Sequence, residues 1–238
     1  METRTVDWTA LRSPDPSDPR ADGLRERKKR QMRQQLSDTA TTMFIQHGFD
    51  AVRVVEIAAA CGVSEKTVYN YFPTKESLLL DRWDTTLTSL QTGLADPELA
   101  PTRAALRILS DELHGLTSWM AAQDDVVAAG NLIRRFGTLV SATPALRAHQ
   151  RDMTDRLIAV AAAVLADRAR MSPDEPEPQI AATALLGLWQ IQFNSLTRYL
   201  DGTRTPTQIH GAVSDDVARA AHIIEVGLAS LDLAAYHR

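Results

Sequence analysis

The sequence has little of what secreted or membrane proteins depend on. Its 238 residues contain a single cysteine, Cys61, which excludes a disulfide framework and indicates a reducing setting. No apolar run approaches the roughly 20 residues that are needed to cross a bilayer, and the N-terminus has no signal-type apolar segment. We therefore expect a soluble, cytoplasmic protein with no membrane partner.

The signatures of catalysis are also missing. The chain has no Gly-rich phosphate loop, no Gly-x-Ser-x-Gly elbow, no His-Glu-x-x-His helix and no cysteine cluster. Its six histidines are scattered without the spacing of metal ligands. We expect neither an enzyme nor a protein that holds a metal or a cofactor.

Strand-like alternation bounded by turn signals is absent as well, so we predict an all-α fold. With 44% hydrophobic residues, the chain can bury a sizeable core. The first helix is predicted over 24–47 and ends at Gly48, and a later one is predicted over 74–92, capped by Thr74 and broken by Gly93 and Pro97. The remaining long helices are predicted over 101–121, 124–136, 144–170, 178–201 and 207–234.

Residues 44–78 contain the most informative pattern, a helix-turn-helix. Val54, Ile57 and Ala58 repeat at helical spacing, Gly62 permits a left-handed turn, and Ser64 can cap a second helix with its hydroxyl. Two short helices therefore meet at a sharp turn.

The second of these helices, over 65–72, is predicted to face inward through Val68 and Phe72, which lie four residues apart. Its opposite face carries small, hydroxylated and amide side chains of the kind that suit a DNA major groove. These are Glu65, Lys66, Thr67, Tyr69, Asn70 and Tyr71.

Several short motifs follow one another from residue 48 to residue 78. They are Gly48-Phe49, Ile57-Ala58, Gly62-Val63-Ser64, Thr67-Val68-Tyr69, Tyr71-Phe72 and Lys75-Glu76-Ser77-Leu78. Together they resemble the DNA-binding part of the tetracycline-repressor (TetR) family of bacterial regulators, over roughly residues 24–80. The resemblance implies an N-terminal three-helix DNA-binding domain followed by a helical ligand-binding and dimerisation domain.

The resemblance also implies particular DNA contacts. Ser64, Thr67, Tyr69 and Tyr71 match positions that contact phosphates or base edges, and Lys75 matches a phosphate-contacting lysine. Lys66 and Asn70 are the strongest candidates for reading base edges, because lysine can serve guanine acceptors and asparagine can serve adenine. Arg53 departs from the family's threonine and cannot cap the first helix of the motif in the same way, although its charge could reach the backbone. The alternative for Tyr69 and Tyr71 is packing, with their hydroxyls in water.

Charge is segregated along the chain, although the net charge is only −4. Between Arg20 and Arg82 there are 11 Lys and Arg against 8 Asp and Glu, whereas from Thr85 onward there are 13 against 17. A basic cluster, Arg25-Glu26-Arg27-Lys28-Lys29-Arg30, opens the first helix, with Arg33 one turn later, and such clusters release counterions when they meet phosphates. Arg25, Arg27 and Lys28 are candidate DNA contacts. The alternative is a solvated helix start.

Three domains are expected. Residues 1–23 are predicted to be a disordered arm that could order along a minor groove, residues 24–73 the DNA-binding domain, and residues 74–238 the effector-binding and dimerisation domain. The last two helices carry long apolar stripes that need a partner surface, which favours a homodimer. Candidates for the ligand pocket are Trp119, Phe136, Trp189, Gln192, Phe193 and Asn194, and the alternative for the aromatic ones is ordinary core.

The predicted function is therefore a ligand-responsive TetR-type transcriptional regulator. We expect a repressor that binds a pseudo-palindromic double-stranded operator as a dimer and is released by a small-molecule effector. The alternative is a helical homodimer that acts through a protein partner without binding DNA.

Overall fold

The computed structural model describes residues 24–80 and 83–229, which are helical and contain no strand. The predicted all-α class is confirmed. The helices are α1 (Leu24–His47), α2 (Val54–Ala60), α3 (Glu65–Tyr71), α4 (Trp83–Ala95), α5 (Pro101–Ala121), α6 (Val126–Ala142), α7 (Pro144–Ala169), α8 (Pro176–Tyr199) and α9 (Pro206–Ala229), with a 3-10 turn at Glu76–Leu78. Residues 1–23, where the arm is predicted, and the predicted helical residues 230–234 lie outside this description.

The chain forms two compact units. The first comprises residues 1–83 and 132–150, and the second comprises residues 84–131 and 151–238. The chain passes between the units within α4, within α6 and within α7. The functional division into an arm, a DNA-binding domain and an effector domain stays a prediction.

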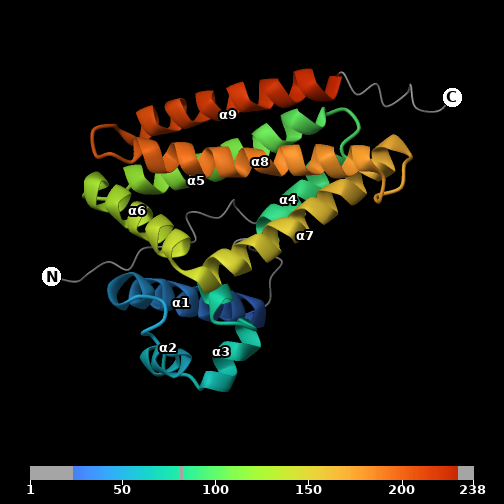
Figure 1. The fold of residues 1–238 in the computed structure, drawn as a ribbon. Coiled ribbons are helices and arrows are strands. Elements are labelled where there is room, and N and C mark those ends of the chain that lie inside the picture. Colours follow the sequence, from blue (N-terminus) through green and yellow to red (C-terminus); the bar gives the residue numbers. More distant parts are fainter. Residues whose placement is uncertain (1–23, 81–82, 230–238) are drawn as a thin grey trace. The chain divides into compact units, whose positions relative to one another are not determined.

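In the first unit, α1 lies across the short helices α2 and α3 (Figure 1). The predicted end of α1 at His47 is confirmed, because Gly48 takes a φ of +88° and its N–H donates to the carbonyl of Phe44. The core is built from α1, the helix-turn-helix and the leucines that follow it, together with Val140 and Leu146. Arg135 of α6 also donates to the carbonyl of Ile45 at 2.9 Å, so the α6–α7 corner belongs to this unit.

The predicted helix over 74–92 is wrong at its start. The chain makes a 3-10 turn at Glu76–Leu78, and α4 begins only at Trp83. Leu78, Leu79 and Leu80 are all buried in one core, and an α-helix cannot direct three successive side chains to one side. Thr74 does act as a cap, since its Oγ1 accepts from the N–H of Ser77 at 3.2 Å.

Two predicted helix ends are also wrong. Gly93 lies inside α4 and does not break it, and a Cβ there would come 3.4 Å from the Ile108 side chain, so the glycine permits close packing of α4 on α5. α6 does not stop at residue 136 but continues to Ala142. The extra turns bring Val140 into the core of the first unit, which stabilises the continued helix.

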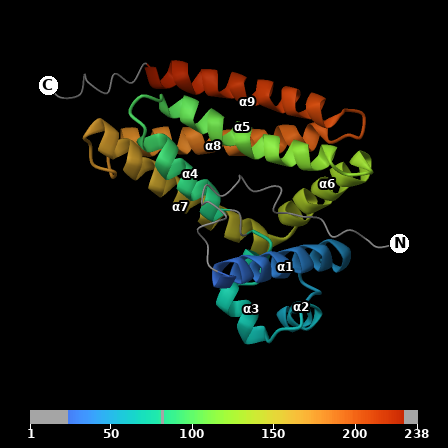
Figure 2. The ribbon, with the colours of Figure 1, turned by 180° about the vertical axis from the view of Figure 1, so that it is seen from behind.

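In the second unit, α8 and α9 run side by side and α5 packs beside both (Figures 1 and 2). The buried residues of α5 include Leu109 and Leu113, those of α8 include Leu185 and Leu188, and Val213 of α9 has no exposed surface. Arg168 of α7 donates to the carbonyl of Leu94, in the last turn of α4, and to the carbonyl of Leu99, which follows that helix. Among the described residues, no helix is long and apolar enough to cross a membrane.

Candidate DNA-binding surface

The turn between α2 and α3 has the geometry that its residues predict. Gly62 has a φ of +68°, in the left-handed region. Ser64 is the N-cap of α3, and its Oγ accepts from the N–H of Thr67 at 3.1 Å and lies 2.8 Å from the Thr67 hydroxyl. The predicted cap is confirmed, and it links Ser64 and Thr67 at the N-terminal end of α3.

The inward face of α3 is the predicted one. Val68 and Phe72 have no exposed surface, while Glu65, Lys66, Tyr69 and Asn70 are exposed. Thr67 and Tyr71 are half-buried, and Tyr71 packs against the core of the first unit. A seven-residue helix therefore presents its polar side chains on a surface fixed from behind by two buried residues.

Arg53 is the N-cap of α2, at a position where a side-chain acceptor would normally serve. A guanidinium has no acceptor, and the N-terminus of α2 is stabilised instead by Glu56. The Glu56 carboxylate accepts from the Arg53 backbone N–H at 2.8 Å and pairs with the Arg53 guanidinium at 3.0 Å. The backbone hydrogen bond, followed by the guanidinium bond, holds the pKa of Glu56 below its usual value. The spacing of a glutamate three residues after the cap was the available sequence signal.

Lys75 is tied to the first unit's own backbone. Its Nζ donates to the carbonyl of Phe49 at 2.6 Å and lies 4.4 Å from the Phe49 ring centroid and 5.6 Å from that of Phe44. The hydrogen bond uses one of the three donors of the ammonium group. If Lys75 contacts a phosphate, it therefore does so with a side chain whose position is already fixed by the Phe49 carbonyl and ring.

The cations of α1 divide into two groups. Arg25, Arg27 and Lys28 are exposed, as are Lys29 and Arg30. Arg33, one turn later, is half-buried and donates from Nη1 to the carbonyl of Tyr71 at 2.7 Å. The sequence pattern included Arg33 in the basic cluster and gave no sign of this inward contact.

The candidate ligand residues do not all lie in one unit. Phe136 packs against the core of the first unit, whereas the others belong to the second. Trp119 is buried, Gln192 and Phe193 are half-buried, and Asn194 is exposed and accepts from Gln190 at 2.8 Å. Trp189 is half-buried.

Glu112 of α5 joins three helices of the second unit. Its Oε2 accepts from the Trp189 indole N–H of α8 at 3.1 Å, and its Oε1 accepts from the Thr86 hydroxyl of α4 at 2.7 Å. Sequence reasoning missed Glu112, because one acidic residue on an amphipathic helix has no distinguishing pattern.

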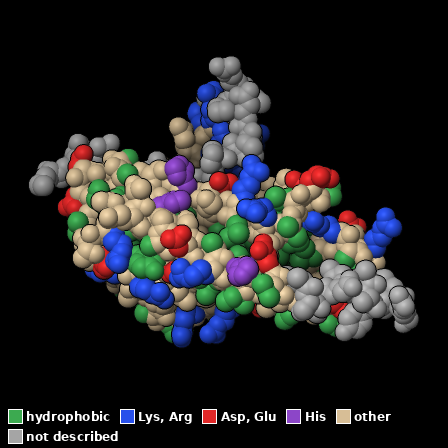
Figure 3. All heavy atoms as spheres, turned by 90° about the horizontal axis from the view of Figure 1, so that it is seen from above, with side chains coloured by type: hydrophobic (Ala, Val, Ile, Leu, Met, Phe, Trp, Pro, Cys, Tyr) green, Lys and Arg blue, Asp and Glu red, His purple; other side chains and the backbone are tan. Residues whose placement is uncertain are grey.

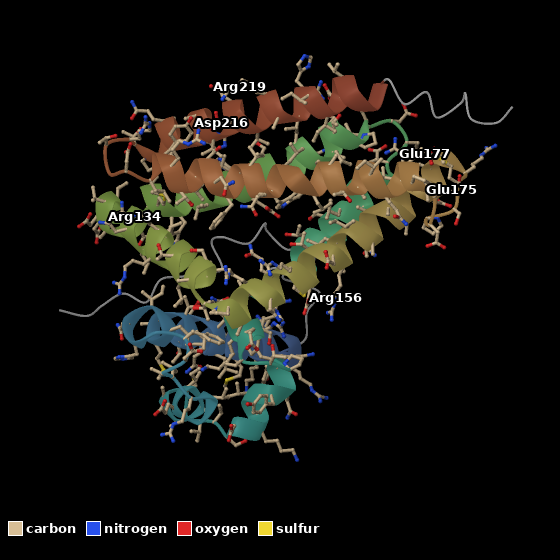
Figure 4. All side chains as sticks on the ribbon, viewed as in Figure 1. Arg134, Arg156, Glu175, Glu177, Asp216 and Arg219 are labelled. Carbon is tan, nitrogen blue, oxygen red and sulfur yellow. The ribbon has the colours of Figure 1, made fainter. Side chains whose placement is uncertain are left out.

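A second carboxylate joins α8 to α9. Asp216 is only 8% exposed, and its Oδ2 accepts from Ser195 at 2.8 Å and from Tyr199 at 3.1 Å. Arg219, one turn further along α9, pairs with its other oxygen (Figure 4). The hydrogen bond from Ser195 is the largest cause that lowers the pKa of Asp216 below its usual value, and Tyr199 and Arg219 lower it further. Burial of the carboxylate acts in the opposite direction and would raise the pKa.

The same two helices expose apolar side chains. On α9, Ile223 is 74% and Val226 60% exposed, and on α8, Ile180 and Ile191 are exposed too. Figure 3 shows hydrophobic side chains among charged ones on the α9 side. Within the part of the chain that the structure describes, no group of three or more His, Cys, Asp or Glu could hold a metal ion.

Comparison with known protein families gives two matches. Residues 36–81 match the model described as bacterial regulatory proteins of the tetR family, and residues 120–214 match the MftR C-terminal domain.

Individual proteins are similar over different lengths. MftR of Mycobacterium tuberculosis, named for transcriptional regulation of mycofactocin biosynthesis, is 28% identical over 182 residues, which are 76% of this chain and 87% of that protein. The HTH-type transcriptional regulator TcmR of Streptomyces glaucescens is 34% identical over 80 residues, 34% of each chain. A crystal structure of a tetR-family transcriptional regulator from Streptomyces coelicolor is 21% identical, with a TM-score of 0.40, covering 90% of this chain and 87% of the other.

Proposed function

Because the chain is a TetR-family transcriptional regulator, we propose that it is a repressor that binds a pseudo-palindromic operator as a homodimer and leaves it when a small molecule binds. The observation that carries the proposal is the surface of α3. Lys66, Tyr69 and Asn70 are exposed over a seam, Val68 and Phe72, that has no exposed surface. A helix held in this way can enter a major groove without losing its own packing.

The DNA contacts divide by chemistry. Lys66 and Asn70 would read base edges, with Glu65 beside them as an acceptor for cytosine amino groups. Phosphates would be met by the hydroxyls and cations of the same surface, which fix the register of the protein on the duplex. These are Ser64, Thr67, Tyr69, Tyr71, Lys75, Arg53, Arg25, Arg27 and Lys28.

The homodimer would use α8 and α9 of both copies. Among the described side chains of these helices, Ile180, Ile191, Ile223 and Val226 are large, aliphatic and exposed, and covering them removes apolar surface from water. A two-fold axis then presents two α3 helices to two half-sites. A regulator that binds an operator would act at the chromosome, in the cytoplasm.

The effector would bind in the second unit, near Trp119, Trp189, Gln192, Phe193 and Asn194. Phe136 packs against the core of the first unit. It would therefore anchor the part of α6 that lies in that unit, and would not contact an effector bound in the second unit. The effector must favour a geometry unsuited to the operator, and typical couplings of about 1–3 kcal/mol would lower operator affinity roughly 5- to 150-fold. Such a change could be carried by α4, α6 or α7, because each of these helices continues from one unit into the other.

The direct test is operator binding by charge-reversal variants. A duplex is first selected by the wild-type protein from a random-sequence pool, and binding is measured by fluorescence anisotropy. Lys66→Glu should abolish selective binding, whereas Arg107→Glu, an equal charge change on the exposed surface of α5, should not. If the wild type selects no duplex, or if Lys66→Glu binds as well as the wild type, the proposal is wrong, and a regulator that acts through a protein partner becomes the better explanation.

A further inference from the structure

The helix α3 depends on the rest of the first unit for its conformation. It has only seven residues, and isolated helices shorter than about 12 residues are marginal in water. Its N-terminus is capped by Ser64, and Phe72 donates to the Val68 carbonyl at its C-terminus. The carbonyls of the last turn that follow Val68 have no partner inside the helix, so its C-terminal end needs a donor from elsewhere.

Arg33 supplies such a donor from α1, 38 residues away in the chain. Its Nη1 donates to the Tyr71 carbonyl at 2.7 Å, and its guanidinium carbon lies 4.6 Å from the centroid of the Phe72 ring. One planar group therefore meets the last carbonyl of α3 and covers the aromatic ring that ends it. A planar guanidinium can lie flat on the ring while an N–H at its edge reaches the carbonyl, whereas an ammonium can contact a ring only as a point charge.

The charge of Arg33 is also suited to this place. The C-terminal end of a helix carries partial negative charge, and a cation there is stabilising. Lys28, by contrast, is on the same helix and is exposed. The two cations differ in surroundings, although both belong to one basic stretch of sequence.

We propose that Arg33 is a positioning residue that fixes the C-terminal end of α3 for base readout and does not itself contact DNA. This inference rests on the proposed operator binding. The inference predicts that Arg33 does not affect the salt dependence of DNA binding. A phosphate contact contributes about 0.9 to the slope of log affinity against log salt concentration, whereas a positioning contact contributes nothing.

The experiment compares Arg33→Lys, Arg33→Gln and Lys28→Gln with the wild-type full-length chain. Each binds the selected duplex and a scrambled duplex of equal length, in KCl between 50 and 200 mM. Arg33→Lys keeps the charge and a donor but loses the planar guanidinium that stacks on the Phe72 ring, so it should lower affinity for the selected duplex by up to about tenfold, the effect of one lost buried stacking contact of a cation on a ring. Its salt slope and its affinity for the scrambled duplex should match the wild type. Lys28→Gln should lower affinity for both duplexes and reduce the slope by about 1.8, since the proposed dimer loses one phosphate contact in each copy.

Amide hydrogen exchange supplies a readout that does not need DNA. Residues 69–72 should exchange faster in both Arg33 variants, while residues 54–60 of α2 keep wild-type protection. The inference is overturned if Arg33→Lys binds like the wild type while Arg33→Gln loses salt slope, because Arg33 is then a phosphate contact. It is also overturned if exchange at residues 69–72 is unchanged. If the wild type selects no duplex, the proposed function fails, and the exchange comparison still decides whether Arg33 holds α3.

Discussion

Replacement of Ile223 should separate the proposed dimer. Ile223 lies on α9 and is 74% exposed in the single chain. Full burial of an isoleucine stabilises by about 1.5–3 kcal/mol, so covering the exposed part is worth roughly 1–2 kcal/mol per copy. A two-fold interface uses the residue twice, and Ile223→Ala should therefore weaken the dimer by roughly 2–4 kcal/mol. That corresponds to a rise in the dimer dissociation constant of roughly 30- to 700-fold.

The assay is sedimentation velocity over a series of protein concentrations, with operator anisotropy on the same samples. Ile223→Glu should dissociate the dimer further, because a carboxylate would have to lose its water in the interface. Val127→Ala is the matched control, since Val127 is a large aliphatic side chain that is 54% exposed but lies on α6. Loss of the dimer should reduce operator affinity, since one α3 reads only one half-site.

The reasoning is refuted if Ile223→Glu sediments as the wild type does at every concentration. It is also refuted if Val127→Ala dissociates the dimer as strongly as Ile223→Ala does, because exposure alone would then not distinguish α9 from α6. A wild type that is monomeric at all concentrations would remove the basis for reading a pseudo-palindrome.

Three further predictions concern other parts of the chain. Asp216→Asn should lower the free energy of unfolding by about 1–2 kcal/mol at pH 7 in urea titrations, near the lower end for a charged hydrogen bond, because largely exposed arginines cover the carboxylate. The Ser195 hydrogen bond is the largest cause that holds the pKa of Asp216 below its ordinary value of 3.8 in the folded protein. Its contribution is therefore fully present above pH 3.8 and is lost as the pH falls through the lower folded value, so a difference from Asp216→Asn that does not shrink as the pH falls below 3.8 would contradict this. Ser64→Ala removes the cap of α3 and should cost about 1 kcal/mol, with faster amide exchange at residues 65–67 as its local sign. Deletion of residues 1–23 should weaken operator binding and flatten its salt slope, and unchanged affinity and slope would rule out a DNA-binding arm.

The helix ends that could be predicted are those with local chemical signals. Gly48 ends α1 by adopting a positive φ, and Ser64 begins α3 through its hydroxyl. Pro101 begins α5 in the first-turn position that a missing N–H permits. In each case the residue acts on the backbone within a few positions of itself, so the sequence contains the whole cause.

The failures have long-range causes. The turn at Glu76–Leu78 forms because three successive leucines are all buried in the core of the first unit. α6 continues past residue 136 because Val140 is buried in the same core. Gly93 was expected to break α4, but it lies within the helix, and its missing side chain lets Ile108 of α5 pack closely against α4. These outcomes depend on partners distant in sequence, which no local pattern contains.

The cations of the DNA-binding part show why the same limit matters for function. Counting charge gives 11 Lys and Arg between Arg20 and Arg82, yet at least three of the described ones already have protein partners in the first unit. Arg33 holds the Tyr71 carbonyl, Lys75 holds the Phe49 carbonyl, and Arg53 pairs with Glu56. DNA must share or compete for Lys75 and Arg53, and Arg33 is proposed to hold α3 without contacting DNA. Arg25, Arg27 and Lys28 are exposed at the start of α1, where they can meet phosphates and release counterions. The salt dependence of operator binding should therefore be set mainly by the start of α1 and by Lys66, and the charge total of the sequence overestimates it.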